Sequence, residues 1–128
     1  MEIYNAVNKR KVLFIDRDGT IIIEPPVTFQ VDNVEQIEFL PAVIRNLFFI
    51  RTKLDFEWAL VTNQDGLGTD VYPQENFDVV QAKFLQILKG EGIEFDKIFV
   101  DTSFPEDHLP TRKPGTAMLT DYFSDSYD

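Results

Sequence analysis

Three short apolar runs, rich in residues that favour β-structure, most constrain the fold of this chain. They are "KVLFI" at 11–15, "FEWALVT" at 56–62 and "FDKIFVD" at 95–101. The first run shows no alternation of apolar and polar residues, so it predicts a central parallel strand that is covered on both faces. A chain with three such runs must supply helices to cover the sheet they form.

Segments with helical periodicity follow each run. One is predicted from Pro41 to Leu54, with Pro41 in its first turn, and another from about Gln74 to Lys89, with Gly90 as its stop. A third helix is expected to open in "TAMLTDYFS" at 116–124. The order β-α-β-α-β-α predicts an α/β fold in three layers, α/β/α, around a parallel sheet. The predicted inward faces are Val43, Ile44, Leu47, Phe48 and Ile50, then Phe77, Val80, Phe84, Leu85 and Leu88.

Length and composition fit one domain and exclude several functions. We expect a leader at 1–10, a domain at 11–128 and a loop at 24–39, where Pro25 and Pro26 forbid a helix. The net charge of −10 argues against binding to nucleic acid or anionic membrane. No apolar run is long enough to span a membrane. The sequence contains no cysteine, which favours the cytoplasm.

Polar side chains gather where each predicted strand ends. Ligands of open parallel α/β sheets bind beyond the carboxyl ends of the strands, so residues far apart in sequence are expected to meet at one rim. They are Asp16 and Asp18 after the first strand, Thr62 and Asn63 at the end of the second, and Asp101, Arg112 and Lys113 at the end of the third or after it.

The two acids after the first strand suggest phosphate chemistry. Two close carboxylates are tolerated when Mg²⁺ lies between them, and Mg²⁺ commonly joins one or two carboxylates to a substrate phosphate. Asp16 can act as a nucleophile, and Asp18 can donate and accept the proton. Lys113 offers a point charge and Arg112 a fork that suits phosphate.

The motifs "FIDRDGT", "VTNQ" and "RKP" resemble the first three motifs of haloacid-dehalogenase-type phosphatases. With "EPP", "FQVD" and "NQDGLGT" they resemble the histidinol-phosphate phosphatase branch, over roughly residues 11–123. In some bacteria that activity is the N-terminal half of a bifunctional protein with imidazoleglycerol-phosphate dehydratase. The resemblance implies a fusion to that dehydratase or an assembly with it.

The resemblance also implies a role for each matching residue. Asp16 is the nucleophile and a Mg²⁺ ligand, while Asp18 is the general acid and base and binds the metal through its backbone carbonyl. Thr62 and Lys113 stabilise the transferring phosphoryl group. The residues expected to contact substrate or phosphate are Arg17, Glu24, Gln30, Asn63 and Arg112.

Two features depart from the family. Its fourth motif, which supplies another metal-binding acid after a fourth strand, has no match after Lys113. We therefore expect a C-terminally incomplete domain that lacks the last strands of its sheet, exposes one edge of the first strand and has little or no phosphatase activity. Related enzymes hold structural zinc in the loop before "RKP" with three Cys and one His. Because that loop contains only His108, we expect no zinc.

Other interpretations stay open. A heptose bisphosphate phosphatase shares the "DRDGT" and "RKP" signatures, although "EPP" and "FQVD" favour histidinol phosphate. The incomplete domain and the charge of −10 suit a non-catalytic assembly or binding fragment. A receiver domain would carry its acceptor Asp after the third strand, which fits less well. Taken singly, Glu24, Gln30 and Arg112 are ordinary solvent-facing polar residues.

Overall fold

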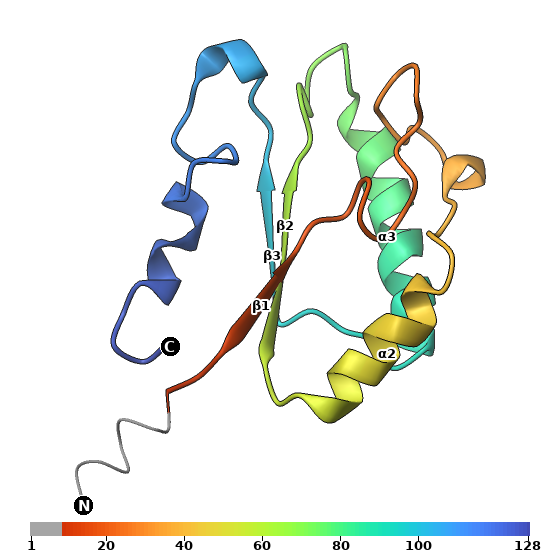
Figure 1. Cartoon of the computed structure of the whole chain (residues 1–128). Helices are drawn as coiled ribbons and strands as arrows, with labels where there is room; N and C mark the ends of the chain where they lie inside the picture. The colour runs from red at the N-terminus through yellow and green to blue at the C-terminus, as the bar shows by residue number, and fades with distance from the viewer. Residues whose placement is uncertain (1–8) are drawn as a thin grey trace, which may run out of the picture.

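The computed structural model describes residues 9–128 and contains one parallel sheet of three strands (Figure 1). The strands are β1 (Val12–Ile15), β2 (Glu57–Asn63) and β3 (Lys97–Asp101), in the spatial order β1-β2-β3. Residues 1–8 of the expected leader lie outside the described residues. All three predicted strands are confirmed, and their parallel pairing places their carboxyl ends at one edge.

Among the described strands β2 is central and β1 lies at the margin. The central position expected for the first strand is therefore not seen in these residues, whereas the exposed edge expected for it is. In β2 the first six residues are buried, whereas β1 is only half-buried and the Phe14 side chain is 39% exposed. Within the described residues β1 pairs with β2 alone, which leaves it at the margin of the sheet. Its unbroken apolar sequence reflects contact with both layers despite that position.

Two α-helices cover one face of the sheet (Figure 1). They are α2 (Val43–Lys53) and α3 (Gln74–Gly90), and the main core lies between them and the sheet. Val80, Phe84 and Leu88 of α3, four residues apart, point into this core as the periodicity predicted, whereas Phe77 packs in a separate cluster with Leu67 and Tyr72. The buried residues of this core are Ile21, Ile22, Val31, Leu47, Trp58, Leu60, Val80, Phe84, Leu88 and Ile93.

The start of α2 differs from the expectation. Ala42, with φ of 63°, precedes the helix, so Pro41 lies outside the first turn and Val43 is the first helical residue. Phe48, predicted to face inward, is 47% exposed. A residue that enters the helix from the left-handed region changes the direction of the chain, and sequence periodicity does not reveal this.

The opposite face of the sheet has a thinner cover. Its main element is the 3₁₀ helix η3 (Ala117–Tyr122), seen in blue in Figure 1, where an α-helix was expected to open. Its turn is tighter because amides bond three residues back, as in Leu119 N to Thr116 O at 2.9 Å. This smaller core contains Ala59, Val61 and Tyr122.

Short connectors complete the described chain. Two further 3₁₀ turns are η1 (Val34–Gln36), in the expected loop at 24–39, and η2 (Pro105–Asp107) after β3. Arg10 pairs with Tyr127 beside the start of β1 and forms an ion pair of 3.1 Å with Glu57. Among the described residues, no helix has the length and apolarity needed to cross a bilayer.

Candidate functional site

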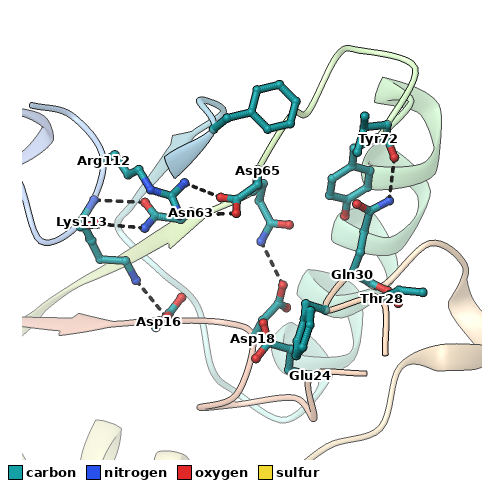
Figure 2. A pocket seen from close by; sticks show the side chains of 14 residues that line it. Asp16, Asp18, Glu24, Thr28, Gln30, Asn63, Asp65, Tyr72, Arg112 and Lys113 are labelled. Carbon is teal, nitrogen blue, oxygen red and sulfur yellow. Dashed lines mark hydrogen bonds and ion pairs between the residues drawn. The ribbon is translucent and has the colours of Figure 1, made fainter. Parts of the chain in front are cut away.

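A cavity of about 470 Å³ opens where the three strands end. In Figure 2, Arg112 and Lys113 form one wall, Glu24, Thr28, Gln30 and Tyr72 form the opposite wall, and Asp16 and Asp18 lie between them. The remaining lining residues are Phe29, Asn63, Gln64, Asp65, Val71 and Phe104. The structure thus brings residues from all three strand ends to one cavity.

A tight turn after β1 presents the two acids. Gly19 has φ of +79°, a conformation that glycine adopts without strain. Its amide donates to the Ile22 carbonyl at 2.7 Å, and the Ile21 amide donates to the Arg17 carbonyl at 2.9 Å. Because Ile21 and Ile22 are fully buried, they anchor this turn in the main core. Asp16 and Asp18 are therefore held at the rim by backbone bonds and by packing.

Asp16 contacts the lysine predicted to share its site. Its Oδ2 lies 2.9 Å from Lys113 Nζ, and its Oδ1 accepts a 2.7 Å hydrogen bond from the Arg17 amide. Lys113 Nζ also donates to the Val61 carbonyl of β2 at 2.9 Å. The ammonium is thus fixed between the end of β2 and the Asp16 carboxylate, where it can neutralise negative charge.

Asn63 binds the loop that contains this lysine. Its side-chain amide accepts from the Lys113 amide at 3.2 Å and donates to the Lys113 carbonyl at 3.3 Å. In the same loop a Cβ at Gly115 would lie 2.3 Å from the Pro110 carbonyl oxygen, so only glycine fits there. Asn63 was expected to contact substrate. It lines the cavity, and both ends of its amide are already used to position Lys113.

Asp101, at the end of β3, anchors the start of that loop. Its carboxylate accepts from Thr111 Oγ1 at 2.6 Å and from Ser103 Oγ at 2.5 Å. Burial raises the pKa of Asp101, but the hydrogen bonds from Ser103 and Thr111 outweigh burial and lower it from its ordinary value. The ionised Asp101 therefore stabilises the segment that presents Arg112 and Lys113.

Arg17 does not line the cavity, so its assignment as a substrate-binding residue needs correction. The side chain is completely buried, and its guanidinium donates two hydrogen bonds to the Asp18 carboxylate, from Nε to Oδ1 at 2.7 Å and from Nη2 to Oδ2 at 3.2 Å. Its Nη1 donates to Gln81 of α3 at 2.9 Å, and the group lies over the Phe77 ring at 5.3 Å. Burial opposes the charge, but Asp18 keeps the pKa of Arg17 above its ordinary value. Arg17 thus orients Asp18 from behind.

Thr62 is likewise fully buried and is not part of the cavity wall. Its Oγ1 accepts a 2.8 Å hydrogen bond from Gln64 Nε2, which also donates to Asp18 Oδ2 at 3.2 Å. Gln64 therefore links Thr62 to the acid. Gln64 was not among the predicted site residues. Its position directly after Thr62 and Asn63 was the sequence signal that could have identified it.

Arg112 lines the cavity as expected, and its charge is already paired. Both terminal nitrogens point at the carboxylate of Asp65, and Nη1 also donates to the Ser103 carbonyl at 3.0 Å. The hydrogen bond that Arg112 donates to Asp65 raises the pKa of Arg112. Asp65 was not among the predicted site residues, although "NQDGLGT" contains it.

Glu24 and Gln30 lie on the wall opposite the cations (Figure 2). Gln30 Nε2 donates to Asp32 Oδ1 at 2.5 Å and to the Val71 carbonyl at 3.2 Å. Partial burial, followed by the charges of Asp18 and Asp16, raises the pKa of Glu24. Within residues 9–128, Glu24 has no cation at ion-pair distance, unlike the other three carboxylates of the cavity.

The donors at the rim fit a hard divalent cation. Asp16 and Asp18 offer carboxylate oxygens, and Mg²⁺ completes such a pair with water and phosphate oxygens. Among the described residues, no three His, Cys, Asp or Glu side chains are grouped to hold a metal. The side-chain carboxylates offered at this rim are therefore the pair Asp16 and Asp18.

Sequence comparison finds relatives that are named as HisB bifunctional proteins. The chain is 60% identical over 121 residues to the histidine biosynthesis bifunctional protein HisB of Bacteroides fragilis, covering 94% of the chain and 32% of that protein. HisB of Spirosoma linguale is 43% identical over 119 residues, covering 93% and 31%, and HisB of Stenotrophomonas maltophilia is 46% identical over 114, covering 89% and 31%. The chain spans about a third of the length of these curated relatives. No family model matches it.

Solved structures share the fold. A D,D-heptose 1,7-bisphosphate phosphatase from B. bronchiseptica, complexed with magnesium and phosphate, superposes with a TM-score of 0.74 at 25% identity, covering 87% of this chain and 60% of that one. A candidate HAD-like phosphatase from Mesorhizobium loti gives 0.69 at 23%, covering 89% and 56%. The resemblance seen in the motifs is confirmed in both sequence and fold.

Proposed function

We propose, from the homology of this chain to HisB bifunctional proteins and from its haloacid-dehalogenase-like fold, that it is a phosphomonoesterase domain. Its proposed reaction converts L-histidinol phosphate and water to L-histidinol and phosphate through an aspartyl-phosphate intermediate. Homology supports a phosphatase of histidine biosynthesis, and the geometry of the rim supports the reaction class.

The single observation that carries the proposal is the 2.9 Å contact between Asp16 Oδ2 and Lys113 Nζ. A nucleophilic carboxylate needs a cation beside the phosphoryl oxygens on which charge develops. Here the two groups come from the end of β1 and from the loop after β3, and they are 97 residues apart by their numbers, 113 − 16. Such a contact, at the edge where α/β sheets bind ligands, is what phosphoryl transfer to Asp16 requires.

The proposed reaction has two steps. A carboxylate oxygen of Asp16 attacks phosphorus, the bond from phosphorus to the substrate oxygen breaks, and Asp18 donates a proton to that leaving oxygen. Asp18 then takes a proton from water as the water oxygen attacks phosphorus, and the bond to Asp16 breaks. Phosphate leaves, Asp16 is again an ionised carboxylate, and Asp18 again carries the proton with which it began the cycle. Arg17 and Gln64 hold the Asp18 carboxylate during these transfers.

Mg²⁺ is the proposed cofactor, and Asp16 and Asp18 would hold it. When bound, it would supply positive charge that draws a phosphate dianion into a cavity with four carboxylates. The magnesium and phosphate of the heptose bisphosphate phosphatase structure support this choice. We propose no zinc site, because the sequence has no cysteine.

The wall opposite the cations supports a cationic leaving group. Glu24 is the cavity carboxylate without a cationic partner among the described residues, so an ammonium or imidazolium of the substrate would supply one. Phe29 and Phe104 also line the cavity and offer faces on which a flat ring can stack. L-Histidinol phosphate carries both an amine and an imidazole.

A heptose bisphosphate phosphatase is the second candidate, favoured by the TM-score of 0.74 to such an enzyme. Its leaving group carries a second phosphate and no cation. That anion would have to lie against Glu24 and Asp65, which makes it the poorer match to this cavity. A non-catalytic assembly fragment would show no turnover of either substrate.

Phosphate release from both substrates tests the proposal. We expect release from L-histidinol phosphate, slower than that by HisB of Bacteroides fragilis, because the fourth-motif acid is not among these residues. Asp16→Asn should abolish it, whereas the exposed Asp70→Asn should not. Equal turnover by Asp16→Asn, or a preference for the heptose bisphosphate, would contradict the mechanism or the substrate. Turnover equal to that of the relative would contradict the expected weakness.

The remaining proposals concern context. The relatives are named as bifunctional proteins, so we propose that this domain works fused to or assembled with imidazoleglycerol-phosphate dehydratase. A cysteine-free domain suits a reducing compartment, and the cytoplasm is the proposed location. Co-purification of this chain with the dehydratase would test the first point.

A further inference from the structure

We propose that Asp65 is an internal competitor for the phosphate-binding guanidinium of Arg112, and so limits the affinity of the site for phosphate. The proposal rests on the proposed function in taking Arg112 as a phosphate-binding residue. It adds a residue that sets how tightly substrate and product phosphate are held.

Among residues 9–128, the cavity has no unpaired cationic side chain to offer an incoming anion. Of its lining residues, Arg112 and Lys113 are the two cations, and each contacts a carboxylate: Asp65 for Arg112 and Asp16 for Lys113. A phosphate dianion must therefore draw one cation away from its present partner, or share it. Asp16 stays in place because it is the proposed nucleophile. Asp65 is therefore the carboxylate that phosphate can displace from its cation, Arg112.

The two members of the Arg112–Asp65 pair differ in how firmly they are held. The guanidinium is anchored without Asp65, because Nη1 donates to the Ser103 carbonyl at 3.0 Å and the Arg112 amide donates to the Leu109 carbonyl at 3.1 Å. The Arg112 side chain is only 17% exposed. Its neighbours Thr111 and Lys113 are bound to Asp101 and Asn63.

Asp65 lacks such anchors. Its side chain is 46% exposed, and within residues 9–128 its carboxylate accepts hydrogen bonds from Arg112 alone. A carboxylate at this exposure is readily solvated once it is released. The next residue, Gly66, has φ of +72° and lies against the Phe104 ring, so the backbone is fixed while the side chain is free to turn. Removing Asp65 should therefore leave Arg112 in place and unpaired.

The two possible roles of Asp65, competing with phosphate or positioning Arg112, predict opposite changes in phosphate affinity when Asp65 is replaced. If Asp65 competes with phosphate, Asp65→Asn frees the guanidinium and tightens binding. If Asp65 positions Arg112, the same change weakens binding. An exposed fork of this kind contributes about 1 kcal/mol or less, so the expected gain in affinity is about 3- to 5-fold.

The test uses inorganic phosphate and the whole chain, titrated by calorimetry in the presence of Mg²⁺. We expect Asp65→Asn to bind phosphate about 3- to 5-fold more tightly than the unchanged chain. Asp70→Asn is the matched control, with the same change of charge on an exposed residue of the same loop, and it should leave affinity unchanged. In an Arg112→Gln background, Asp65→Asn should give no gain, which isolates the coupling between the two side chains.

Each other outcome overturns the proposal. The proposal is contradicted if Asp65→Asn binds phosphate equally or more weakly, or if Asp70→Asn shows the same gain in affinity. It is also contradicted if the gain persists in the Arg112→Gln background, or if no variant binds phosphate measurably. The proposed function is judged separately by release of phosphate from L-histidinol phosphate. If the chain hydrolyses this ester but Asp65→Asn binds phosphate no more tightly, the proposed function is supported and the proposed role of Asp65 is contradicted.

Discussion

The two faces of the sheet differ in depth, and each positions a different half of the candidate site. Among the described residues, the core beneath α2 and α3 contains ten buried residues, whereas the core beneath η3 contains three. The acid Asp18 is gripped by Arg17 and Gln64 on the deep side. Lys113 and Arg112 lie in a loop beyond the shallow side, held mostly by hydrogen bonds from single side chains.

This difference suggests that the two faces of the sheet support different parts of the proposed reaction. The proposed proton-transferring group, Asp18, needs a fixed orientation, and the buried guanidinium of Arg17 behind it supplies one. In the proposed reaction, the cations of the loop would exchange partners as phosphate enters and leaves. A loop with few buried contacts allows that exchange at low cost.

The largest expected effect tests the depth of the helical face. Phe84 of α3 is fully buried and stacks against Phe39 with centroids 6.0 Å apart. We expect Phe84→Ala to lower the free energy of unfolding by about 3–5 kcal/mol. Urea denaturation followed by circular dichroism measures this, with the exposed Phe49→Ala as the control. A loss under about 1 kcal/mol would show that the deep core is not the stabilising one.

Next is a comparison of the two arginine–aspartate forks. Arg17→Met removes a buried partner of Asp18 and should cost about 2–3 kcal/mol, reduced from the fully buried value because the Asp18 side chain is 11% exposed. Arg112→Met breaks the more exposed fork and should cost about 1 kcal/mol or less. Equal losses in urea denaturation would remove the contrast between the faces.

A smaller effect concerns the anchor of the shallow side. The pKa of Asp101 is lowered from 3.8 in the folded chain, so its ionised form adds stability above about pH 4, and this is lost as pH falls through the lower folded value. Asp101→Asn should cost about 1 kcal/mol at pH 7. It should also lose less stability than the unchanged chain between pH 5 and about pH 3. Parallel pH profiles of unfolding would contradict this role.

The smallest expected effect lies in the shallow core. The hydroxyl of Tyr122 is buried and, among the described residues, has no hydrogen-bond partner, while its ring packs edge-on against Phe14 and Phe99. Burial, followed by the nearby carboxylate of Glu57, raises the pKa of this phenol, although the two groups do not meet hydrogen-bond geometry. Tyr122→Phe keeps the ring and removes the buried hydroxyl, so stability should change by less than about 0.5 kcal/mol or rise. A loss above about 1 kcal/mol would mean that the hydroxyl is bonded in solution.

The strands and the main helices could be read from the sequence because their signals are local. An apolar run predicts a strand and apolar residues at helical spacing predict a helix, without knowledge of what lies opposite. The order of β1, β2 and β3 then predicted that their polar ends share one rim. The sequence did not predict the 3₁₀ form of η3 or the left-handed conformation of Ala42. Both depend on backbone geometry that residue type alone does not indicate.

The motifs alone predicted which residue types gather at the strand ends: two acids one residue apart, a Thr-Asn pair and an Arg-Lys pair. Only the tertiary structure decided which side chains face the cavity. Neighbours in sequence point in different directions at a strand end, so Arg17 and Thr62 turned inward while Asp65 and Gln64 reached the wall. The physical reason is that a buried guanidinium and a buried hydroxyl need hydrogen-bond partners, and these came from Gln81 of α3 and from Gln64, residues whose nearness no local pattern records.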